Sequence, residues 1–242
     1  MEKTIASFAR LPWIGRRVQK AYWKYIAWKT NPVPRIRRAM AGRKDVSILV
    51  IGANDGPSTD PIFPLMHEHL NWRGTFVEPV PYLFEKLRWN YAARADCTFV
   101  NVAVSTATGT LRFHYVSPQA RKEHPEFPTW VEQLGTFDKS IILNCLEGRL
   151  EPYIVEVEIE AITLRELFTR AHVTTLDVLM IDSEGHDWKI LQQLDLQQFQ
   201  PAVILFENCF LSPEDRAAAR RFLEPLYRIE DLGKDYFCRL TR

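Results

Sequence analysis

The chain has 242 residues, of which 46% are hydrophobic. That is enough for the core of one α/β domain with an appendage, and too little for two full domains. The net charge of +1 hides an asymmetry, because residues 1–44 hold 12 of the 31 Lys and Arg but only one, Glu2, of the 30 Asp and Glu. The remaining residues carry 19 basic and 29 acidic side chains, a net charge of −10, which argues against a nucleic-acid-binding body.

The length of the apolar runs and the spacing of the cysteines indicate where in the cell the protein is located. No apolar run approaches the roughly 18 residues of a membrane-spanning helix. The four cysteines are widely spaced, and no secretory leader is recognisable. We therefore expect free thiols and a cytoplasmic protein, with attachment to the inner face of a membrane left open.

Residues 1–44 are predicted to form a basic, amphipathic helical extension. Val18, Tyr22 and Tyr25 recur at spacings of three or four, and basic residues do the same on another face. This pattern fits a helix docked on the body, and it also fits a helix that contacts a membrane surface through residues 1–30. Pro32 and Pro34 are expected to end the helix and to begin a linker.

The stretch SILVIGANDG, residues 47–56, is the first strong strand signal. Its apolar run stops in a turn bounded by glycines, which is typical of a buried parallel strand that delivers a loop to a ligand. A helix is expected over 57–70, a strand over 74–80, a helix over 82–93 and a strand over 97–105. This alternation predicts a parallel sheet with right-handed crossovers.

The regular pattern is interrupted after Gly109. A strand over 111–116 is expected to pair with the strand before it, and residues 117–152 form an irregular insertion with four prolines. Such an insertion in a compact domain favours a lid or substrate loop. The remaining pattern predicts strands over 153–162, 227–232 and 236–240, helices over 163–171 and 213–223, and apolar strands that run into polar turns within 176–188 and 201–209.

Polar side chains follow four of the predicted strands at the point where each strand ends. In an open parallel sheet these ends line one crevice. A single carboxylate at such a position is more often a helix cap or a solvated loop charge, but four strand ends weaken that interpretation. The residues are Asn54 and Asp55, Glu78, Asp182 and Glu184, and Glu207 and Asn208.

The loop 52–56 and Glu78 together indicate a nucleoside-binding site. Glycine tolerates positive φ and lets the backbone approach a ligand closely. Glu78 follows Gly52 by 26 residues, the place of the acidic residue that binds a ribose diol in nucleoside-binding sheets. Because the third glycine of the dinucleotide fingerprint is missing, a nucleoside cofactor without a diphosphate is favoured.

Five segments resemble the FkbM family of S-adenosylmethionine-dependent methyltransferases. The resemblance spans roughly residues 46–210 in the expected order. Its segments are VIGANDG, FVEPVPYLFEKLRWN, NVAVS with Gly109 following, LGTFDKSIIL and LMIDSEGHDWKIL.

This resemblance implies a Rossmann-like class I methyltransferase sheet of seven mostly parallel strands, the last one antiparallel, over residues 45–242. It implies that Gly52, Asn54, Asp55 and Gly56 surround the methionine part of the cofactor, that Glu78 holds the ribose, and that Asn101 and Ala103 approach the adenine. It also implies O-methylation of a hydroxyl on a sugar, glycolipid or secondary metabolite. Many relatives have Lys and Glu where this chain has Met180 and Asp187.

The base that removes the acceptor proton is predicted among Asp182, Glu184 and His186. The sulfonium donor is already activated, so the protein has to align the reactants and accept a proton. Histidine has the more suitable ordinary pKa, whereas a carboxylate would need its pKa raised by burial or by nearby negative charge. The three residues therefore remain alternatives.

A metal-assisted variant is a further hypothesis. Asp182, Glu207 and Asn208 resemble the carboxylate and amide ligands that hold Mg²⁺ in catechol-type O-methyltransferases. Two other functions are considered: a cofactor-binding scaffold without catalysis, and a nucleic-acid methyltransferase. The clustered carboxylates disfavour the scaffold, and the acidic body disfavours nucleic acid as a partner.

Overall fold

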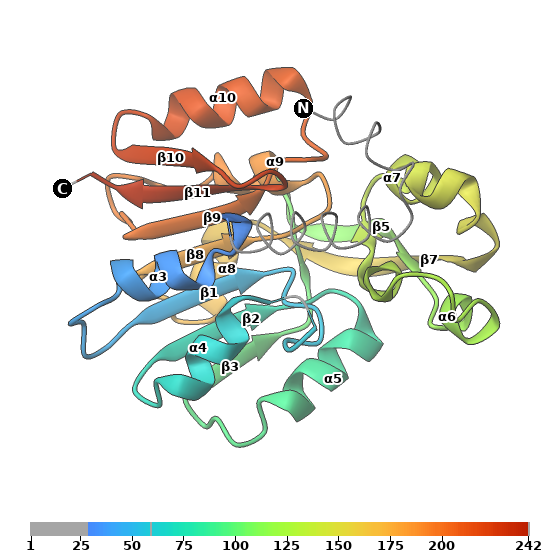
Figure 1. The fold of residues 1–242 in the computed structure, drawn as a ribbon, viewed down its shortest axis with the longest axis horizontal. Coiled ribbons are helices and arrows are strands. Elements are labelled where there is room, and N and C mark those ends of the chain that lie inside the picture. The colour runs from blue at the N-terminus through green and yellow to red at the C-terminus, as the bar shows by residue number, and fades with distance from the viewer. Residues whose placement is uncertain (1–28, 59, 242) are drawn as a thin grey trace, which may run out of the picture.

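A computed structural model describes residues 29–58 and 60–241 of the chain, and its centre is a seven-stranded sheet (Figure 1). The strand order is β10-β11-β9-β8-β1-β2-β3, and only β11 runs antiparallel to its neighbours. This confirms the predicted fold class. The strands are β1 (Ser47–Ile51), β2 (Arg73–Val77), β3 (Cys97–Val100), β8 (Val178–Ile181), β9 (Val203–Glu207), β10 (Tyr227–Asp231) and β11 (Asp235–Leu240).

Helices cover both faces of this sheet because its central strands are buried on both sides. One apolar core lies under α8 (Leu164–Arg170), α9 (Asp187–Leu191) and α10 (Pro213–Leu223). The other lies under α3 (Val33–Ala39), α4 (Ile62–Glu68) and α5 (Pro81–Asn90). Side chains alternate between the two cores along each strand; Leu49 and Leu179 enter the first, and Val50 and Met180 the second.

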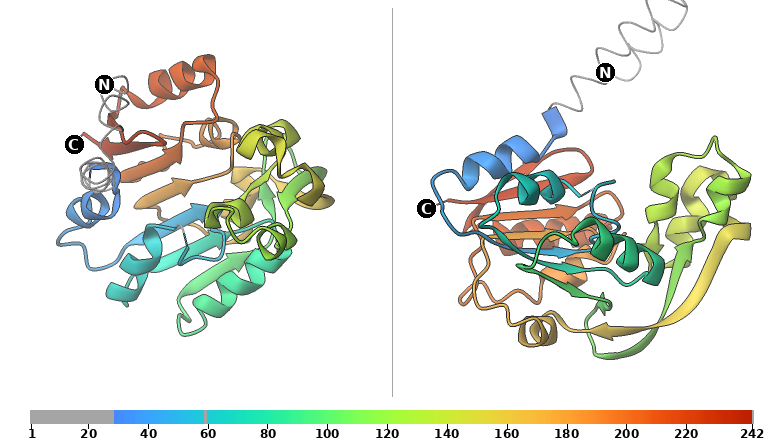
Figure 2. Two further views of the ribbon diagram at one scale, coloured as in Figure 1. Left: turned by 45° about the vertical axis from the view of Figure 1, so that its right-hand side comes forward. Right: turned by 90° about the horizontal axis from the view of Figure 1, so that it is seen from below.

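A second, four-stranded sheet has the order β4-β7-β5-β6. Its strands are β4 (Ala103–Val104), β5 (Gly109–Val116), β6 (Gly135–Thr136) and β7 (Ile154–Ile162). The predicted strand over 97–105 is thus divided between the two sheets. The expected pairing of 111–116 with the preceding strand is wrong, because β5 pairs along its whole length with β7. The β5–β7 ribbon curves away from the main sheet and carries the insertion at its far end (Figure 2).

The insertion between β5 and β7 is more ordered than the sequence pattern predicts. It contains α6 (Gln119–Glu123), α7 (Lys139–Asn144) and three short 3-10 helices, η1 (Thr129–Gln133), η2 (Cys145–Gly148) and η3 (Glu151–Tyr153). Val131, Ile142 and Leu150 are fully buried in an apolar core that belongs to the insertion itself. The insertion is therefore a small packed unit held by two strands.

The N-terminal part of the described chain differs from the prediction. Lys29 and Thr30 are helical, and Pro32 and Pro34 then begin α3 instead of a linker. Proline suits a first helical turn, where backbone N–H groups have no partner within the helix. The predicted helix before residue 29 lies outside the described residues. Within the described residues, no helix is long and apolar enough to cross a membrane.

Candidate functional site

The turn after β1 brings the ends of β1, β2 and β8 together. Gly52 has φ +80°, and its N–H donates to the carbonyl of Val77 at 2.9 Å. A Cβ at this position would lie 1.7 Å from the carbonyl oxygen of Asp182. Only glycine fits here, because a side chain would both strain the backbone and collide with the end of β8.

Glu78 follows β2 and holds this turn. Its carboxylate accepts the backbone N–H of Asn54 at 2.9 Å and that of Val80 at 2.8 Å. The side chain is only 3% exposed. Burial raises the pKa of Glu78 to about 7, although the two hydrogen bonds act in the opposite direction. Glu78, the residue predicted to bind the ribose, is thus a buried carboxyl group that is held in a fixed position and exchanges a proton near neutral pH.

A narrow cleft runs along the carboxyl ends of β1, β2 and β8. Its free volume is about 30 Å³, roughly the room that one water molecule takes in the liquid. Six predicted site residues line it: Gly52, Asn54, Glu78, Ala103, Asp182 and Glu184. Segments more than 130 residues apart in sequence therefore meet in one place, as the positions at strand ends predict.

Three predicted cofactor residues lie outside the lining of this cleft. The Asp55 carboxylate accepts the N–H and the hydroxyl of Ser58. Gly56 has φ +89° and faces apolar side chains. The Asn101 amide donates to the carbonyls of Glu78 and Pro79 at 2.7 and 3.2 Å. Asn101 thus stabilises the backbone at Glu78. Contact of Asp55, Gly56 and Asn101 with a ligand stays a prediction.

The loop after β8 is held by Asp187, a residue that the sequence analysis noted only as a departure from relatives. Asp187 is fully buried, and its carboxylate accepts the N–H groups of Ser183 at 3.4 Å and Gly185 at 3.3 Å. Glu184 has φ +47°, which is uncommon for a residue with a side chain. The buried carboxylate offsets that strain and keeps Glu184 at the cleft.

His186 is buried next to Phe137, a residue of the cleft lining. Its Nε2 lies 3.1 Å from the Ser105 hydroxyl, and its ring centroid is 4.6 Å from that of Phe137. Burial lowers the pKa of His186 to about 4, so the imidazole is neutral at pH 7. It does not belong to the residues that line the cleft, and its catalytic role stays a prediction.

Three carboxylates gather at the ends of β8 and β9. Asp182, Glu184 and Glu207 each offer one oxygen, and these oxygens lie within 4.8 Å of one another. Burial raises the pKa values of all three; the charge of Asp182 adds to the effect at Glu184 and Glu207, and the charge of Asp235 adds to it at Asp182. One oxygen each of Glu184 and Glu207 is buried without a hydrogen-bond partner among the described residues. Oxygen donors of this kind suit Mg²⁺ or Ca²⁺.

The group contains Glu184, which the metal hypothesis did not include. Asn208 directly follows Glu207, and its role as a metal ligand stays a prediction. The backbone N–H of Asn208 donates to the Lys234 carbonyl at 2.7 Å. The positive charge of Lys234 lowers the pKa of Asp182 and Glu184, against the larger effect of burial.

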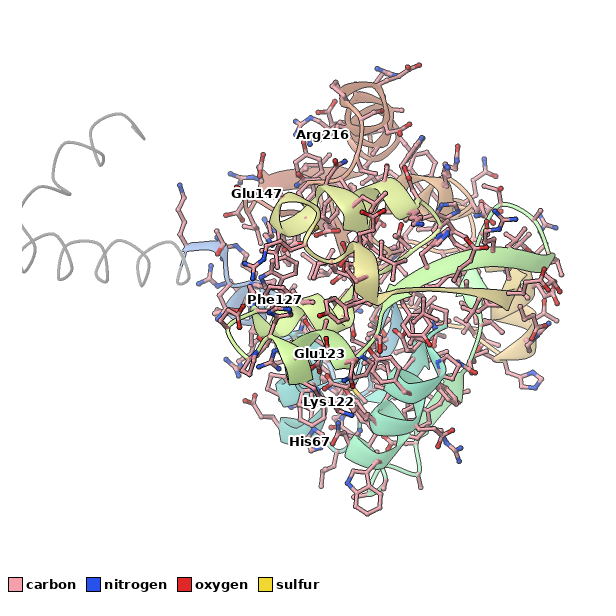
Figure 3. The ribbon with its side chains drawn as sticks, turned by 90° about the vertical axis from the view of Figure 1, so that its right-hand side faces the viewer. His67, Lys122, Glu123, Phe127, Glu147 and Arg216 are labelled. Atoms are coloured by element: carbon pink, nitrogen blue, oxygen red, sulfur yellow. The ribbon has the colours of Figure 1, made fainter. Side chains whose placement is uncertain are left out.

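Several residues of the cleft lining were not predicted from the sequence, because most of them are apolar and their side chains indicate no particular chemistry. They come from β4 and the residue before it, from β5, from the insertion and, for Ser183, from the turn after β8. Figure 3 looks onto the insertion, with His67 of α4 at the lower edge and Arg216 of α10 at the upper edge. The missed residues are Val102, Val104, Phe113, Gln133, Gly135, Phe137 and Ser183.

The fold and the cleft define a class of protein. A sheet with this strand order, a single antiparallel strand and helices on both faces is the Rossmann-like sheet of class I methyltransferases, with the cleft where that fold binds its ligand. A family model described as "Methyltransferase FkbM domain" matches residues 51–236. The chain therefore belongs to the FkbM methyltransferase family, and the predicted resemblance is confirmed.

Solved structures of methyltransferases are similar to this chain at low sequence identity. A precorrin-6y C5,15-methyltransferase from Geobacter metallireducens is 11% identical, with a TM-score of 0.44 over 87% of each chain. TrmK of M. capricolum with S-adenosyl-homocysteine is 10% identical (TM-score 0.41; 87% of this chain, 68% of that one). Fibrillarin of Aeropyrum pernix with S-adenosyl-L-methionine is 12% identical (TM-score 0.40; 80% and 65%). No curated protein matches the sequence significantly.

Proposed function

We propose that the protein transfers a methyl group from S-adenosyl-L-methionine to a hydroxyl group of a sugar, glycolipid or secondary metabolite. One observation carries the proposal. Glu78, suited to a ribose diol, and Asp182 and Glu184, suited to accept a proton, line the same cleft at the carboxyl ends of the sheet. Donor binding and proton removal would therefore take place side by side.

The residues of the cleft fit this cofactor. Gly52 leaves backbone open where a side chain would block it. The Asn54 side-chain oxygen is buried and has no hydrogen-bond partner among the described residues, so it is free to accept from the amino group of the methionine part. Glu78 would bind the ribose, and Val102 to Val104 would flank the adenine. When bound, the sulfonium supplies an activated methyl group.

Asp182 is the base that the environment favours. Burial and the negative charge of Asp235 raise its pKa to about 7, close to the value at which a general base works best at neutral pH. His186 is a weaker candidate because its low pKa makes it a poor proton acceptor and its Nε2 is engaged by Ser105. Glu184 would orient the acceptor hydroxyl beside Asp182.

We extend the proposal to the insertion, residues 117–152, as a lid. Small-molecule sites usually have volumes of about 300–1,000 Å³, so a cleft of about 30 Å³ has to widen before a nucleoside enters. The insertion covers the cleft through few contacts. The Thr136 hydroxyl donates to the Glu184 carbonyl at 2.9 Å, and the Tyr82 hydroxyl donates to the Glu132 carbonyl at 2.7 Å.

A divalent cation remains part of the proposal. Asp182, Glu184 and Glu207 would hold it, and the two unpartnered carboxylate oxygens support a fit. Bound there, Mg²⁺ would favour ionisation of an acceptor hydroxyl. The same three residues would still position and deprotonate the acceptor if no ion binds.

Calorimetry and a transfer assay test the proposal. We expect S-adenosyl-L-methionine and S-adenosyl-homocysteine to bind the full chain, and label from the methyl donor to appear on a hydroxyl of sugars, glycolipids or polyketide alcohols. Failure of both ligands to bind a cooperatively folding sample would refute the cofactor. Label transferred only to RNA or protein would refute the acceptor class.

A further inference from the structure

A second hollow of the described surface lies away from the methyl-transfer cleft. It has a volume of about 390 Å³ and lies between α3 and the α3-facing side of β10 and β11. Figure 1 shows α3 in front of the sheet, below β11 in the view. We call it the arginine hollow, because Arg35, Arg38, Arg228 and Arg239 line it, with Phe237 and a single acid, Glu230.

Only one of the four arginines is neutralised within the hollow. Arg35 makes a bidentate ion pair with Glu230, with Nε–Oε2 and Nη2–Oε1 distances of 3.0 and 2.6 Å. Arg38, Arg228 and Arg239 are exposed and make no ion pair with any described residue. Four positive charges against one negative charge leave a local charge of +3. The hollow therefore attracts anions.

Two of these arginines are held directly opposite each other. Arg228 on β10 and Arg239 on β11 are partners in the antiparallel register, and like charges at such a position are unfavourable. An anion shared between them would remove this repulsion. Guanidinium groups form two parallel hydrogen bonds with phosphate oxygens, so a phosphate group suits the pair.

The sequence next to the hollow indicates where the phosphate comes from. The segment 1–28 joins the described chain just before α3 and contains six Lys or Arg, one acid and several Trp and Tyr. Because it is basic, it is not itself the occupant of a positive hollow. Basic residues combined with interfacial aromatic residues are typical of segments that contact anionic lipid surfaces.

We propose that the arginine hollow binds lipid phosphates at the surface of an anionic membrane. The body from residue 45 onward carries a net charge of −10 and is repelled by such a surface. The molecule would therefore attach through the face that carries α3, β10 and β11, and this attachment would fix its orientation. The proposal does not depend on the identity of the methyl acceptor.

Vesicle co-sedimentation of the full chain tests it. We expect binding to phosphatidylcholine vesicles that contain phosphatidylglycerol, little binding to phosphatidylcholine alone, and release at high salt. Each basic side chain near an anionic surface contributes roughly fivefold to partitioning. The double variant Arg228→Gln/Arg239→Gln should thus bind about 25-fold more weakly.

The matched control is Arg165→Gln/Arg221→Gln, which removes two exposed, unpaired arginines elsewhere on the described surface. It should bind like the unchanged protein. Equal binding by the hollow variant and the unchanged protein would overturn the proposal, as would an equal loss in the control. Binding of single-stranded RNA but not vesicles, dependent on Arg228 and Arg239, would overturn it in favour of nucleic acid. Thermal unfolding of both variants verifies that they are folded.

Discussion

The carboxylate of Glu78 accepts the backbone N–H of Asn54, so the end of β2 holds the turn that follows β1. Its other oxygen accepts the N–H of Val80. One side chain thereby fixes both sides of the cleft floor. Each oxygen keeps a second lone pair for a ligand hydroxyl, so structural support and ligand binding are combined in a single carboxyl group.

Replacing Glu78 with Gln should weaken both the fold and cofactor binding. Both carboxylate oxygens face backbone N–H groups, so either orientation of the amide turns its NH₂ group toward a donor. Leaving a buried group unsatisfied costs about 1–3 kcal/mol. We expect a loss of that size in urea unfolding and weaker binding of S-adenosyl-homocysteine in calorimetry. The exposed Glu85→Gln on α5 is the control, and equal affinities for all three proteins would contradict the ribose assignment.

Two glycine substitutions separate backbone strain from collision. Gly52 and Gly233 have φ values of +80° and +100°, but an added Cβ meets the Asp182 carbonyl at the first and nothing within 4 Å at the second. Gly233→Ala should cost about 1–2 kcal/mol, the price of a left-handed residue. Gly52→Ala should cost several-fold more in urea unfolding and abolish cofactor binding. Similar losses in the two variants would show that the close approach to Asp182 is unimportant.

Asp60 should make the protein less stable as the pH rises. Its side chain is buried; one oxygen accepts the Ile62 N–H at 2.7 Å, and the other has no partner among the described residues. Burial raises the pKa of Asp60 to about 8. The folded state thus binds more protons than the unfolded state between about pH 4 and about pH 8, and stability falls over that interval.

Asp60→Asn keeps the acceptor without the charge. Its stability relative to the unchanged protein should therefore rise by on the order of 1 kcal/mol per pH unit between about pH 5 and about pH 8. The exposed Asp195 accepts an N–H two residues onward in the same way, so Asp195→Asn is the matched control. Urea unfolding across this pH range measures the stability of each protein. Parallel pH profiles of stability for the unchanged protein and both variants would contradict the prediction.

Thr136→Val should loosen the insertion. The buried Thr136 hydroxyl donates to the Glu184 carbonyl and accepts the Asp138 N–H at 3.1 Å. Valine keeps the shape and loses these bonds, each worth about 1 kcal/mol. S-adenosyl-homocysteine should then dissociate at least roughly fivefold faster in stopped-flow measurements. The exposed Thr129→Val on η1 is the control. A loss of stability without faster dissociation would mean that the insertion is not a lid.

Divalent ions should stabilise the protein through Glu207. Mg²⁺ or Ca²⁺ would neutralise three crowded carboxylates, so we expect thermal unfolding to move to higher temperature with added ion. Glu207→Gln should lose most of that shift, whereas Glu214→Gln on the surface of α10 should retain it. Identical melting temperatures with and without ions, or equal shifts in both variants, would count against a metal.

The mostly parallel main sheet and the convergence of its polar residues were predictable from sequence, because strands alternate with helices and the polar residues stand at strand ends. The order of the strands was not predicted. Apolar runs that stop at Gly52, Glu78 and Asp182 mark where a parallel sheet opens to a ligand. The second sheet was not accessible in this way. Pairing of β5 with β7 joins residues that are 38 to 52 positions apart in sequence, and nothing in the sequence of either strand indicates its partner.

Local backbone geometry was the other feature that could not be predicted from the sequence. The positive φ of Glu184 depends on the buried carboxylate of Asp187, which accepts the N–H of Gly185. The sequence does not indicate this contact, because only the folded loop brings these atoms together. Likewise, Pro32 and Pro34 are compatible with either end of a helix. The contact of Ile36 with the sheet decides in favour of a beginning.

The β5–β7 ribbon has a consequence for how acceptor choice diversifies among relatives. The insertion keeps its own apolar core and is carried by two adjacent strands, so its outer surface is able to vary while Gln133, Gly135 and Phe137 continue to line the cleft. Exchange of residues 117–152 between two family members should accordingly transfer acceptor preference as a single unit.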